Sequence, residues 1–406
     1  MNLFFKVTLL FIVLFDLSFK ILPIISTGKI GVLLLTIYFF LINKKKITIN
    51  KKEAYIFVLY FFIFTHAILV FILNGMPETK TIARLLYYFI YSVWLSYVCI
   101  VVFRNRMDFF KTLSIVVFVQ SCFVIVSWLS IDFRVFIDSL LVQTGNLSLL
   151  SAQRPPGLMN SAGAKASVIL GIGSAITFYQ LTCNNSKKSV LIYSFMFMVS
   201  TVSTLIVGRT GLLLLMVLVS TILIQNGRQL IFTYRFLKIV VIFTLVIIIT
   251  ILIIPESVLP LINHKVNWIV SEFSDGLFKA KTLIYLQQMT IKELDISTLI
   301  GTSQIRLPGG QHDSGYIQNY HSLGLIFTII FYGIVLFHLL TLSHISKNFV
   351  KRNRLFIVVF ISSLFIIEYK EPFVLSYSFL FILFTMLRIQ DYKENKKIKI
   401  GENYEY

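Results

Sequence analysis

Residues 189–225 read SVLIYSFMFMVSTVSTLIVGRTGLLLLMVLVSTILIQ. Two apolar runs, 189–207 and 210–225, flank a short turn that contains Arg209 between two glycines. An apolar helix of about 20 residues is long enough to cross roughly 30 Å of hydrocarbon. The stretch therefore predicts two antiparallel membrane-spanning helices joined by a polar turn.

The composition extends this pattern to the whole chain. Of its 406 residues, 57% are hydrophobic and 14% are charged, and the mean hydropathy is +0.84. Soluble domains carry about 25% charged residues, so this composition indicates an integral membrane protein. A β-barrel would need short strands of alternating hydrophobicity instead of long apolar runs. We expect an all-α polytopic membrane protein with a single transmembrane domain over residues 1–406.

Twelve segments are predicted to cross the membrane. They are 3–24, 28–42, 54–73, 81–103, 112–131, 161–181, 189–207, 210–225, 238–254, 322–342, 355–368 and 373–388. No signal-peptidase site follows the first apolar run, so it is expected to be a retained helix. That segment contains Asp16 and Lys20, and the second and eleventh segments are short; re-entrant or differently bounded helices are the alternative for these three.

The distribution of basic residues predicts the topology. With both termini in the cytoplasm, the basic clusters of 44–52, 347–354 and 388–399 face the cytoplasm, whereas the external connections hold only scattered Lys and Arg residues. This imbalance follows the positive-inside rule. The net charge of +19 is then a topology signal and a contact with lipid headgroups, and no nucleic-acid partner is expected.

Two external connections are long, at 132–160 and at 255–321, the latter between the ninth and tenth predicted helices. Long loops in compact proteins are usually functional. The larger loop includes an amphipathic stretch, 277–294, that is expected to lie along the membrane surface. The absence of an internal repeat or of paired broken helices modestly disfavours a transporter.

Two of the external polar segments centre on an arginine. Arg154 begins the sequence RPPGLMN, in which prolines stiffen the chain and Gly157 permits a tight turn. Arg209 lies in the turn between two long apolar runs, where a charge is costly without a partner. The alternative for both residues is an arginine that anchors a helix end at the interface.

A third external segment precedes and begins the tenth predicted helix. A His-Asp pair can deprotonate a hydroxyl group, and here the alternative is polar groups that only cap the helix. The three cysteines are scattered and are expected to be packing residues, and no metal-ligand spacing is present. The polar residues of the segment are Arg306, His312, Asp313, Ser314, Tyr316 and His321.

Other polar residues have simpler interpretations. Arg84 and Lys165 are expected to extend from helix ends towards the interface, with phosphate binding as the alternative. Glu368 and Glu371 flank Lys370 in the last external turn, and a surface ion pair is enough to explain them. His66 and His338 are interpreted as packing or interfacial residues.

At its three external polar segments the chain resembles the O-antigen and capsular polysaccharide polymerase family (Wzy type) and the related O-antigen ligases. Arg154-x-x-Gly157 resembles the family's Arg-x-x-Gly segment, and Arg209-Thr-Gly resembles its Ser-Arg-Thr-Gly turn, with glycine in place of serine. Ligases carry His, then Asn, Ser or Gln, nine further residues and Gly. Counting back from Gly324 places Asp313 at the first position, which favours a polymerase, although His312 is adjacent.

The resemblance implies a helical bundle like that of lipid-dependent glycosyltransferases, in a bacterial cytoplasmic membrane. It implies polymerisation of undecaprenyl-diphosphate-linked oligosaccharide repeat units on the external face, without metal or other cofactor. A chain-length regulator and a flippase are the implied protein partners. The implied site assigns Arg154 and Arg209 to the leaving diphosphate, Arg306 to the second diphosphate, Asp313 or His312 to deprotonation, and Gly157, Tyr316 and His321 to substrate binding.

Three other functions stay open from the sequence. A ligase would transfer finished polymer to another acceptor by the same chemistry. A flippase or other transporter would place its charged residues near the midplane of the membrane, whereas here they gather at one face. A scaffold without catalysis would tolerate alanine at Arg154 and Arg209.

Overall fold

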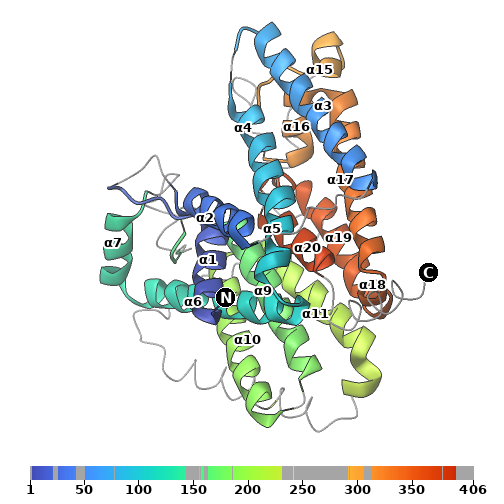
Figure 1. Ribbon diagram of the computed structural model, residues 1–406. Helices are drawn as coiled ribbons and strands as arrows, with labels where there is room; N and C mark the ends of the chain where they lie inside the picture. Colours follow the sequence, from blue (N-terminus) through green and yellow to red (C-terminus); the bar gives the residue numbers. More distant parts are fainter. Residues whose placement is uncertain are drawn as a thin grey trace, which may run out of the picture.

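The computed structural model of the chain (Figure 1) describes most of the sequence in several stretches. These are residues 2–21, 26–42, 51–76, 78–142, 155, 157–159, 163–184, 186–230, 241, 291, 293–305, 313–376 and 378–389. Of the large predicted loop, 255–321, they include only 291, 293–305 and 313–321. The amphipathic stretch 277–294 and the ninth predicted helix, 238–254, lie almost entirely outside them.

The described residues form helices joined by turns, and their only β-structure is a pair of isolated bridges, Ser18–Ser26 and Phe19–Leu141. The helices are α1 (Leu3–Phe15), α2 (Thr27–Ile42), α3 (Lys51–Leu73), α4 (Lys80–Tyr87), η1 (Tyr88–Trp94, a π-helix), α5 (Leu95–Val102), α6 (Arg106–Leu129), α7 (Ile131–Leu140), α9 (Ala164–Cys183), α10 (Lys187–Val207), α11 (Arg209–Leu230), α15 (Ile296–Ile300), α16 (Gly315–Leu323), α17 (Leu325–Ile345), α18 (Lys347–Arg352), α19 (Arg354–Glu368) and α20 (Ser378–Arg388).

Six helical segments of this described part are long and apolar enough to cross a membrane. They are Lys51–Leu73, Lys80–Val102, Arg106–Leu129, Ala164–Cys183, Lys187–Val207 and Leu325–Ile345. The expectation of a helical membrane protein is thereby confirmed. The count of twelve spans stays a prediction, because four further apolar stretches are shorter: Leu3–Phe15, Thr27–Leu41, Arg209–Gln225 and Ser378–Arg388.

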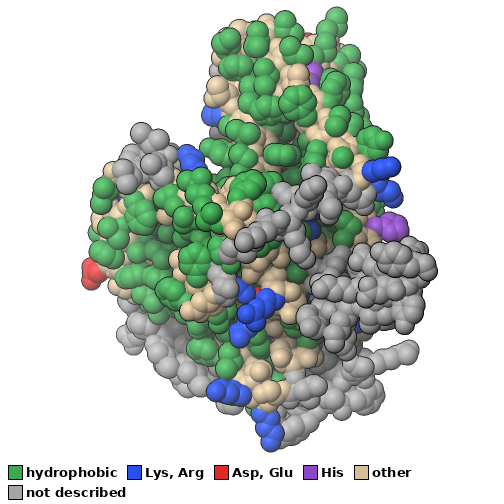
Figure 2. Space-filling view, in the orientation of Figure 1, with side chains coloured by type: hydrophobic (Ala, Val, Ile, Leu, Met, Phe, Trp, Pro, Cys, Tyr) green, Lys and Arg blue, Asp and Glu red, His purple; other side chains and the backbone are tan. Residues whose placement is uncertain are grey.

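The helices form two groups that share a central element (Figure 1). In one group α3 packs on α17 and α4, and α16 lies against α17; in the other, α9 packs on α6, α10 and α11. Helix α20 contacts η1, α5, α17 and α9, and all its residues are buried. Apolar side chains are widespread on the visible face of the first group (Figure 2), as expected of a surface that meets lipid.

Two predicted helices are shortened or interrupted in the structure. The segment predicted as 3–24 ends its helix at Phe15, because Asp16 adopts a left-handed conformation with φ of 44° and its carboxylate accepts from the backbone N–H of Gly28 at 2.9 Å. The segment predicted as 322–342 is divided at Gly324, which has a φ of 83° and separates α16 from α17. Glycine adopts such conformations without a Cβ clash.

The break at Gly324 is held by a second glycine and a histidine. A Cβ on Gly301 would overlap the backbone of Gly324, and a Cβ on Gly324 would overlap that of Gly301. The ring Nε2–H of His66 donates to the carbonyl oxygens of Ile300 at 2.9 Å and Leu323 at 3.2 Å. The backbone carbonyl groups at these two helix ends are therefore hydrogen-bonded inside the protein, as the membrane environment requires.

Helix α7 occupies part of the external connection predicted for 132–160. Ser130 caps its start, since its hydroxyl group accepts from the backbone N–H of Phe133 at 3.2 Å. Ile131, Val135 and Phe136 expose most of their apolar side chains. A short helix with an apolar exposed face suits the membrane interface.

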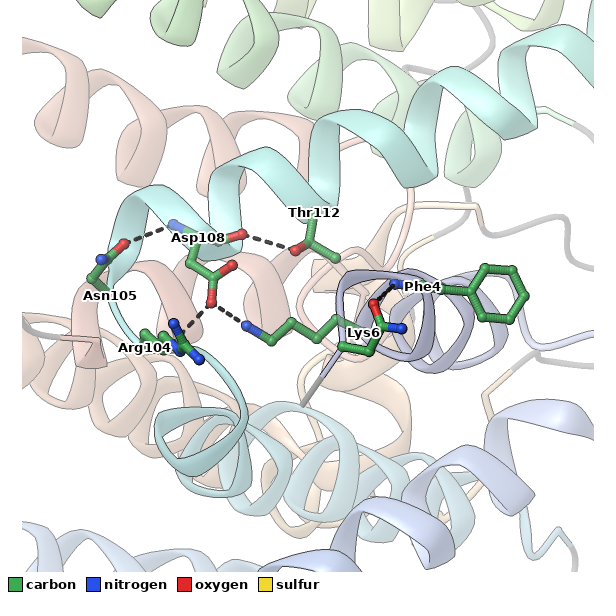
Figure 3. A network of polar contacts seen from close by, with 7 residues as sticks. Phe4, Lys6, Arg104, Asn105, Asp108 and Thr112 are labelled. Atoms are coloured by element: carbon green, nitrogen blue, oxygen red, sulfur yellow. Dashed lines mark hydrogen bonds and ion pairs between the residues drawn. The ribbon is translucent and has the colours of Figure 1, made fainter.

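The helix ends assigned to the cytoplasm contact one another. Lys6 of α1 is buried and forms an ion pair with Asp108 of α6 (Figure 3). The Asp108 carboxylate also accepts from the backbone N–H of Arg104 at 3.1 Å. Asn105 caps α6 by accepting from the backbone N–H of Asp108 at 2.8 Å, and the hydroxyl group of Thr112 donates to the Asp108 carbonyl at 2.8 Å. A buried lysine needs such a partner.

A second buried ion pair joins α3 to α20. Arg388 Nη1 lies 2.6 Å from Glu53 Oε1, and both side chains are less than 5% exposed. The guanidinium of Arg388 also donates to Ser96 at 3.2 Å and to His338 Nε2 at 3.3 Å, and it stacks 3.5 Å above the ring of Tyr97. His338 is thus a packing residue that accepts from Arg388, in agreement with its interpretation from sequence.

Candidate functional site

The start of α16 packs directly against the connection between α19 and α20. Gly315 is the first residue of α16, and a Cβ at this position would overlap the carboxylate of Glu368 and the backbone of Pro372. Only glycine allows this approach without a shift of one of the two segments. The contact joins the segment that contains Asp313 to residues 368–372, which follow it by more than 50 positions.

The carboxylate of Glu368 is the centre of a buried hydrogen-bond network. The Tyr332 hydroxyl group donates to Glu368 Oε1 at 2.7 Å, and the backbone N–H of Val374 donates to Oε2 at 2.7 Å. Asn319 Nδ2 in turn donates to the Tyr332 hydroxyl oxygen at 2.7 Å. Glu368 is 0% exposed. The network therefore ties α16, α17 and α19 to the turn before α20.

A second network includes Arg84, in the last turn of α4. Arg84 Nη1 donates to Gln318 Oε1 at 2.7 Å, and Gln318 Nε2 donates to the carbonyl oxygen of Asp313 at 3.3 Å. Gln318 is buried, whereas Arg84 and Asp313 are half-buried. Arg84 also lowers the electrostatic cost of the buried Glu368 carboxylate. Its guanidinium thus faces the Asp313 segment instead of only reaching the interface.

The start of α11 connects to the same region through Lys370. Lys370 Nζ donates to the Thr210 hydroxyl oxygen at 3.1 Å. Thr210 directly follows Arg209, the first residue of α11, whose side chain is half-buried. The second and third polar segments of the sequence are therefore linked through the turn that contains Glu368 and Lys370.

Close contact between α9 and α11 fixes the position of Arg209. The backbone N–H of Gly211 donates to Ser167 Oγ at 3.1 Å, and a Cβ on Gly211 would overlap the backbone of Ser167. A Cβ on Gly171 would likewise overlap Gly211. Small residues allow membrane helices to approach this closely. Arg209 is therefore the first residue of a helix whose first turn is tightly packed against α9.

The first polar segment is represented by Gly157 and its neighbours. Gly157 has a φ of 63°, and a Cβ there would meet Val124 and Gln120 of α6. Residues 157–159 form a bend, and Gly157 rests on α6. Arg154, with which the segment begins, lies outside the described residues, as do Arg306 and His312.

Two further predicted binding residues lie on α16. The Tyr316 hydroxyl group donates to the carbonyl oxygen of Phe365 at 2.7 Å, and its ring lies 4.9 Å from that of Tyr332, between centroids. Burial and the charge of Glu368 raise the pKa of Tyr316 to about 12. His321 is 1% exposed, and its carbonyl oxygen accepts from Thr302 near the break at Gly324. Their predicted roles in substrate binding stay predictions.

The interpretation of Glu368 as half of a surface ion pair was wrong. Its carboxylate is buried and bound by a hydroxyl group and a backbone N–H, while Lys370 contacts Thr210. Sequence reasoning also missed Tyr332, Asn319 and Gln318, which stand in apolar or weakly polar stretches. A glutamate at the end of an apolar helix was the one available signal, because a carboxylate is costly at such a depth.

Three cations are connected to the start of α16, which follows the half-buried Asp313. Arg84 reaches it through Gln318, Lys370 belongs to the turn that packs against Gly315, and Arg209 precedes Thr210, which accepts from Lys370. Among the described residues no group of three His, Cys, Asp or Glu side chains is placed to hold a metal ion. Guanidinium groups bind phosphate oxygens by paired hydrogen bonds, so these cations suit an anionic substrate.

Comparison with models of protein families, with curated proteins and with solved structures finds no match for this chain.

Proposed function

We propose that this protein joins undecaprenyl-diphosphate-linked oligosaccharide repeat units into O-antigen or capsular polysaccharide on the external face of the cytoplasmic membrane. The observation that carries the proposal is the contact chain from Asp313 through Gly315 and Glu368 to Lys370 and Thr210. It links the polymerase-like turn at Arg209 to the polar segment at the start of α16. These are the two segments that the reaction requires on one side of the membrane.

The reaction is a transfer of a glycosyl group. A sugar hydroxyl of one repeat unit attacks the anomeric carbon of another, the new glycosidic bond forms, and the bond to the diphosphate breaks. Asp313 or His312 takes the proton of the attacking hydroxyl, and Arg209 with Arg154 stabilises the negative charge that grows on the leaving undecaprenyl diphosphate. Arg306 binds the second diphosphate.

Glu368 acts in this proposal as a positioning residue. It is fully buried, so it holds the start of α16 through Tyr332 and Asn319 without touching substrate. Arg84 holds the other side of the same segment through Gln318. Placement of a general base within hydrogen-bond reach of its proton depends on such support.

Ligase-type transfer to another acceptor and lipid-linked glycan transport are the alternative functions. The buried Arg388–Glu53 pair offers no support for a transport path, because Glu53 lies in the first turn of α3 and its carboxylate is bound to Arg388. A transporter's coupling site would lie near the middle of the bilayer.

The test is the length of the glycan made in cells of the host that lack the protein and are complemented with variants. Arg209→Ala and Asp313→Asn should leave single repeat units, at membrane protein levels equal to wild type by immunoblot. Arg104→Ala and Asp132→Asn are matched controls and should keep full polymer length. Both side chains are exposed, and they belong to the segment before α6 and to α7.

The same cells separate the alternatives. Free lipid-linked polymer without the protein would identify a ligase, and repeat units retained on the cytoplasmic side would identify a transporter. Full-length polymer from both Arg209→Ala and Asp313→Asn would exclude the proposed site.

A further inference from the structure

An apolar groove of about 500 Å³ lies between α3 and the helix formed by α4 and η1. Tyr60, Tyr88 and Leu85 form its buried floor, and Val58, Phe61 and Leu86 belong to its rim. All of its lining residues are aliphatic or aromatic. The hydroxyl groups of Tyr60 and Tyr88 are hydrogen-bonded to each other, so the floor offers little to a polar ligand.

The groove opens towards the outside of the bundle. Val58, Phe61 and Leu86 are 65%, 70% and 44% exposed. Both walls belong to segments long and apolar enough to cross a membrane, Lys51–Leu73 and Lys80–Val102. The opening of such a groove faces hydrocarbon, so the occupant enters from the bilayer. Its volume falls in the range of about 300–1,000 Å³ that is usual for small-molecule sites.

Arg84 is the cation of α4 that comes next to the lining residues in the chain. It directly precedes Leu85 and lies one helical turn before Tyr88, and both of these belong to the floor. Its guanidinium donates to Gln318, whose amide contacts the Asp313 segment. An extended hydrocarbon chain in the groove would therefore bring an anionic headgroup to Arg84 and to the proposed catalytic segment. A lipid with an uncharged headgroup would gain nothing from the positive charge of Arg84.

The irregular wall of the groove also points to a binding role. The π-helix η1 begins at Tyr88, a residue of the floor. Short π-helical segments inside α-helices are rare and are frequent at functional sites. The stretch of α3 from Phe57 to Phe64 that lines the groove rises about 10 Å, so the groove holds one part of a long chain and leaves the rest in the bilayer.

We propose that this groove binds the isoprenoid chain of the polyprenyl diphosphate substrate, next to Arg84. The inference rests on the proposed function and adds to it the place of the lipid chain. The groove takes no part in the chemical reaction. By holding the lipid chain, it sets how deep in the membrane the substrate lies and how its headgroup is oriented towards α16.

Photocrosslinking of the full chain in lipid nanodiscs tests this assignment. The probe is a polyprenyl diphosphate without sugar that carries a diazirine on an isoprene unit near the headgroup, and the labelled peptides are identified by mass spectrometry. Labelling should fall on residues 57–64 and 85–89. Unlabelled polyprenyl diphosphate should reduce it several-fold, and an equal amount of phosphatidylglycerol should not.

Leu86→Trp should reduce labelling several-fold because the indole fills the opening. Leu69→Trp is its control: Leu69, on α3, is 54% exposed and is not a lining residue. Val58→Trp on the facing helix repeats the test if Leu86→Trp fails to fold. Arg84→Gln should weaken competition by the diphosphate while labelling by a neutral polyprenol probe is unchanged.

Crosslinking requires no turnover, so this experiment tests lipid binding in the groove independently of the proposed polymerase activity. Labelling elsewhere on the protein, or equal competition by phosphatidylglycerol, overturns the groove assignment even if polymer is made. Specific labelling of the groove in a protein that makes no polymer upholds the lipid site and rejects the polymerase.

Discussion

The hydroxyl group of Tyr332 on α17 donates a 2.7 Å hydrogen bond to the buried carboxylate of Glu368 at the end of α19. The same hydroxyl oxygen accepts from Asn319 on α16. One phenol group thus connects three helices where they meet the proposed site. A buried carboxylate without its donors carries a large desolvation cost.

Tyr332→Phe should lower the thermal unfolding temperature and shorten the polymer. It removes a donor from Glu368 and an acceptor from Asn319, and an unsatisfied buried group of this kind costs about 1–3 kcal/mol. Tyr369→Phe is the control, since Tyr369 is 48% exposed. Unfolding temperatures measured in detergent should separate the two variants; equal temperatures would mean that the network contributes nothing.

Gly315→Ala should abolish or strongly reduce polymerisation. Its methyl group would overlap the Glu368 carboxylate and the Pro372 backbone, so α16 or the 368–372 turn must move. Gly333→Ala is the matched control, because no atom lies within 4 Å of a Cβ at that position. Alanine in a helix interior is favoured over glycine by about 1 kcal/mol, so Gly333→Ala should be neutral or stabilising. Full polymer from Gly315→Ala would contradict the close packing.

The Glu53–Arg388 pair should show strong energetic coupling. Arg388→Met leaves the Glu53 carboxylate buried and unpaired, a change that typically costs about 3–5 kcal/mol. Adding Glu53→Gln should recover part of this loss in a double-mutant cycle of unfolding free energies. The Glu78–Lys80 pair is the control, with its lysine 68% exposed, and should couple by less than about 1 kcal/mol. If the losses of unfolding free energy at Glu53 and Arg388 are additive, the interaction between the two side chains does not stabilise the protein.

Stability should fall in alkaline solution partly because of Tyr316. Its pKa is raised to about 12, chiefly by burial and also by Glu368, above the usual value of about 10. The unfolded chain then loses the proton first, so this contribution is complete below pH 10 and is lost as the pH rises to about 12. Tyr316→Phe should flatten the decline in this window, whereas the exposed Tyr369→Phe should leave the slope unchanged. An unchanged slope in Tyr316→Phe would exclude this origin.

The sequence was sufficient for the class of fold, whereas the site that it suggested stays a prediction. Apolar runs such as 189–207 correspond to helices, because length and hydropathy alone decide whether a segment can span a membrane. The side chains that support Asp313 could not be predicted. Gly315 meets Glu368 across 53 positions of sequence, and no local pattern reports which helix ends become neighbours.

Helix ends were predicted less well than helices for a related reason. Asp16 ends α1 by adopting a left-handed conformation that Gly28, twelve residues later, stabilises. Gly324 divides α16 from α17 because Gly301 comes against it. Hydropathy continues through both positions, whereas the backbone turns there in response to a partner from elsewhere in the chain.

The ion pair between α3 and α20 also constrains biosynthesis. Glu53 leaves the ribosome long before Arg388 is translated, so α3 enters the membrane with a carboxylate whose partner does not yet exist. Until α20 arrives, that end of α3 must stay near water or lipid headgroups, and the centre of the bundle stays open. Helix α20, the last one in the described part of the chain, therefore closes the assembly, and a chain that stops before it would present an unneutralised acid to the quality-control proteases of the membrane.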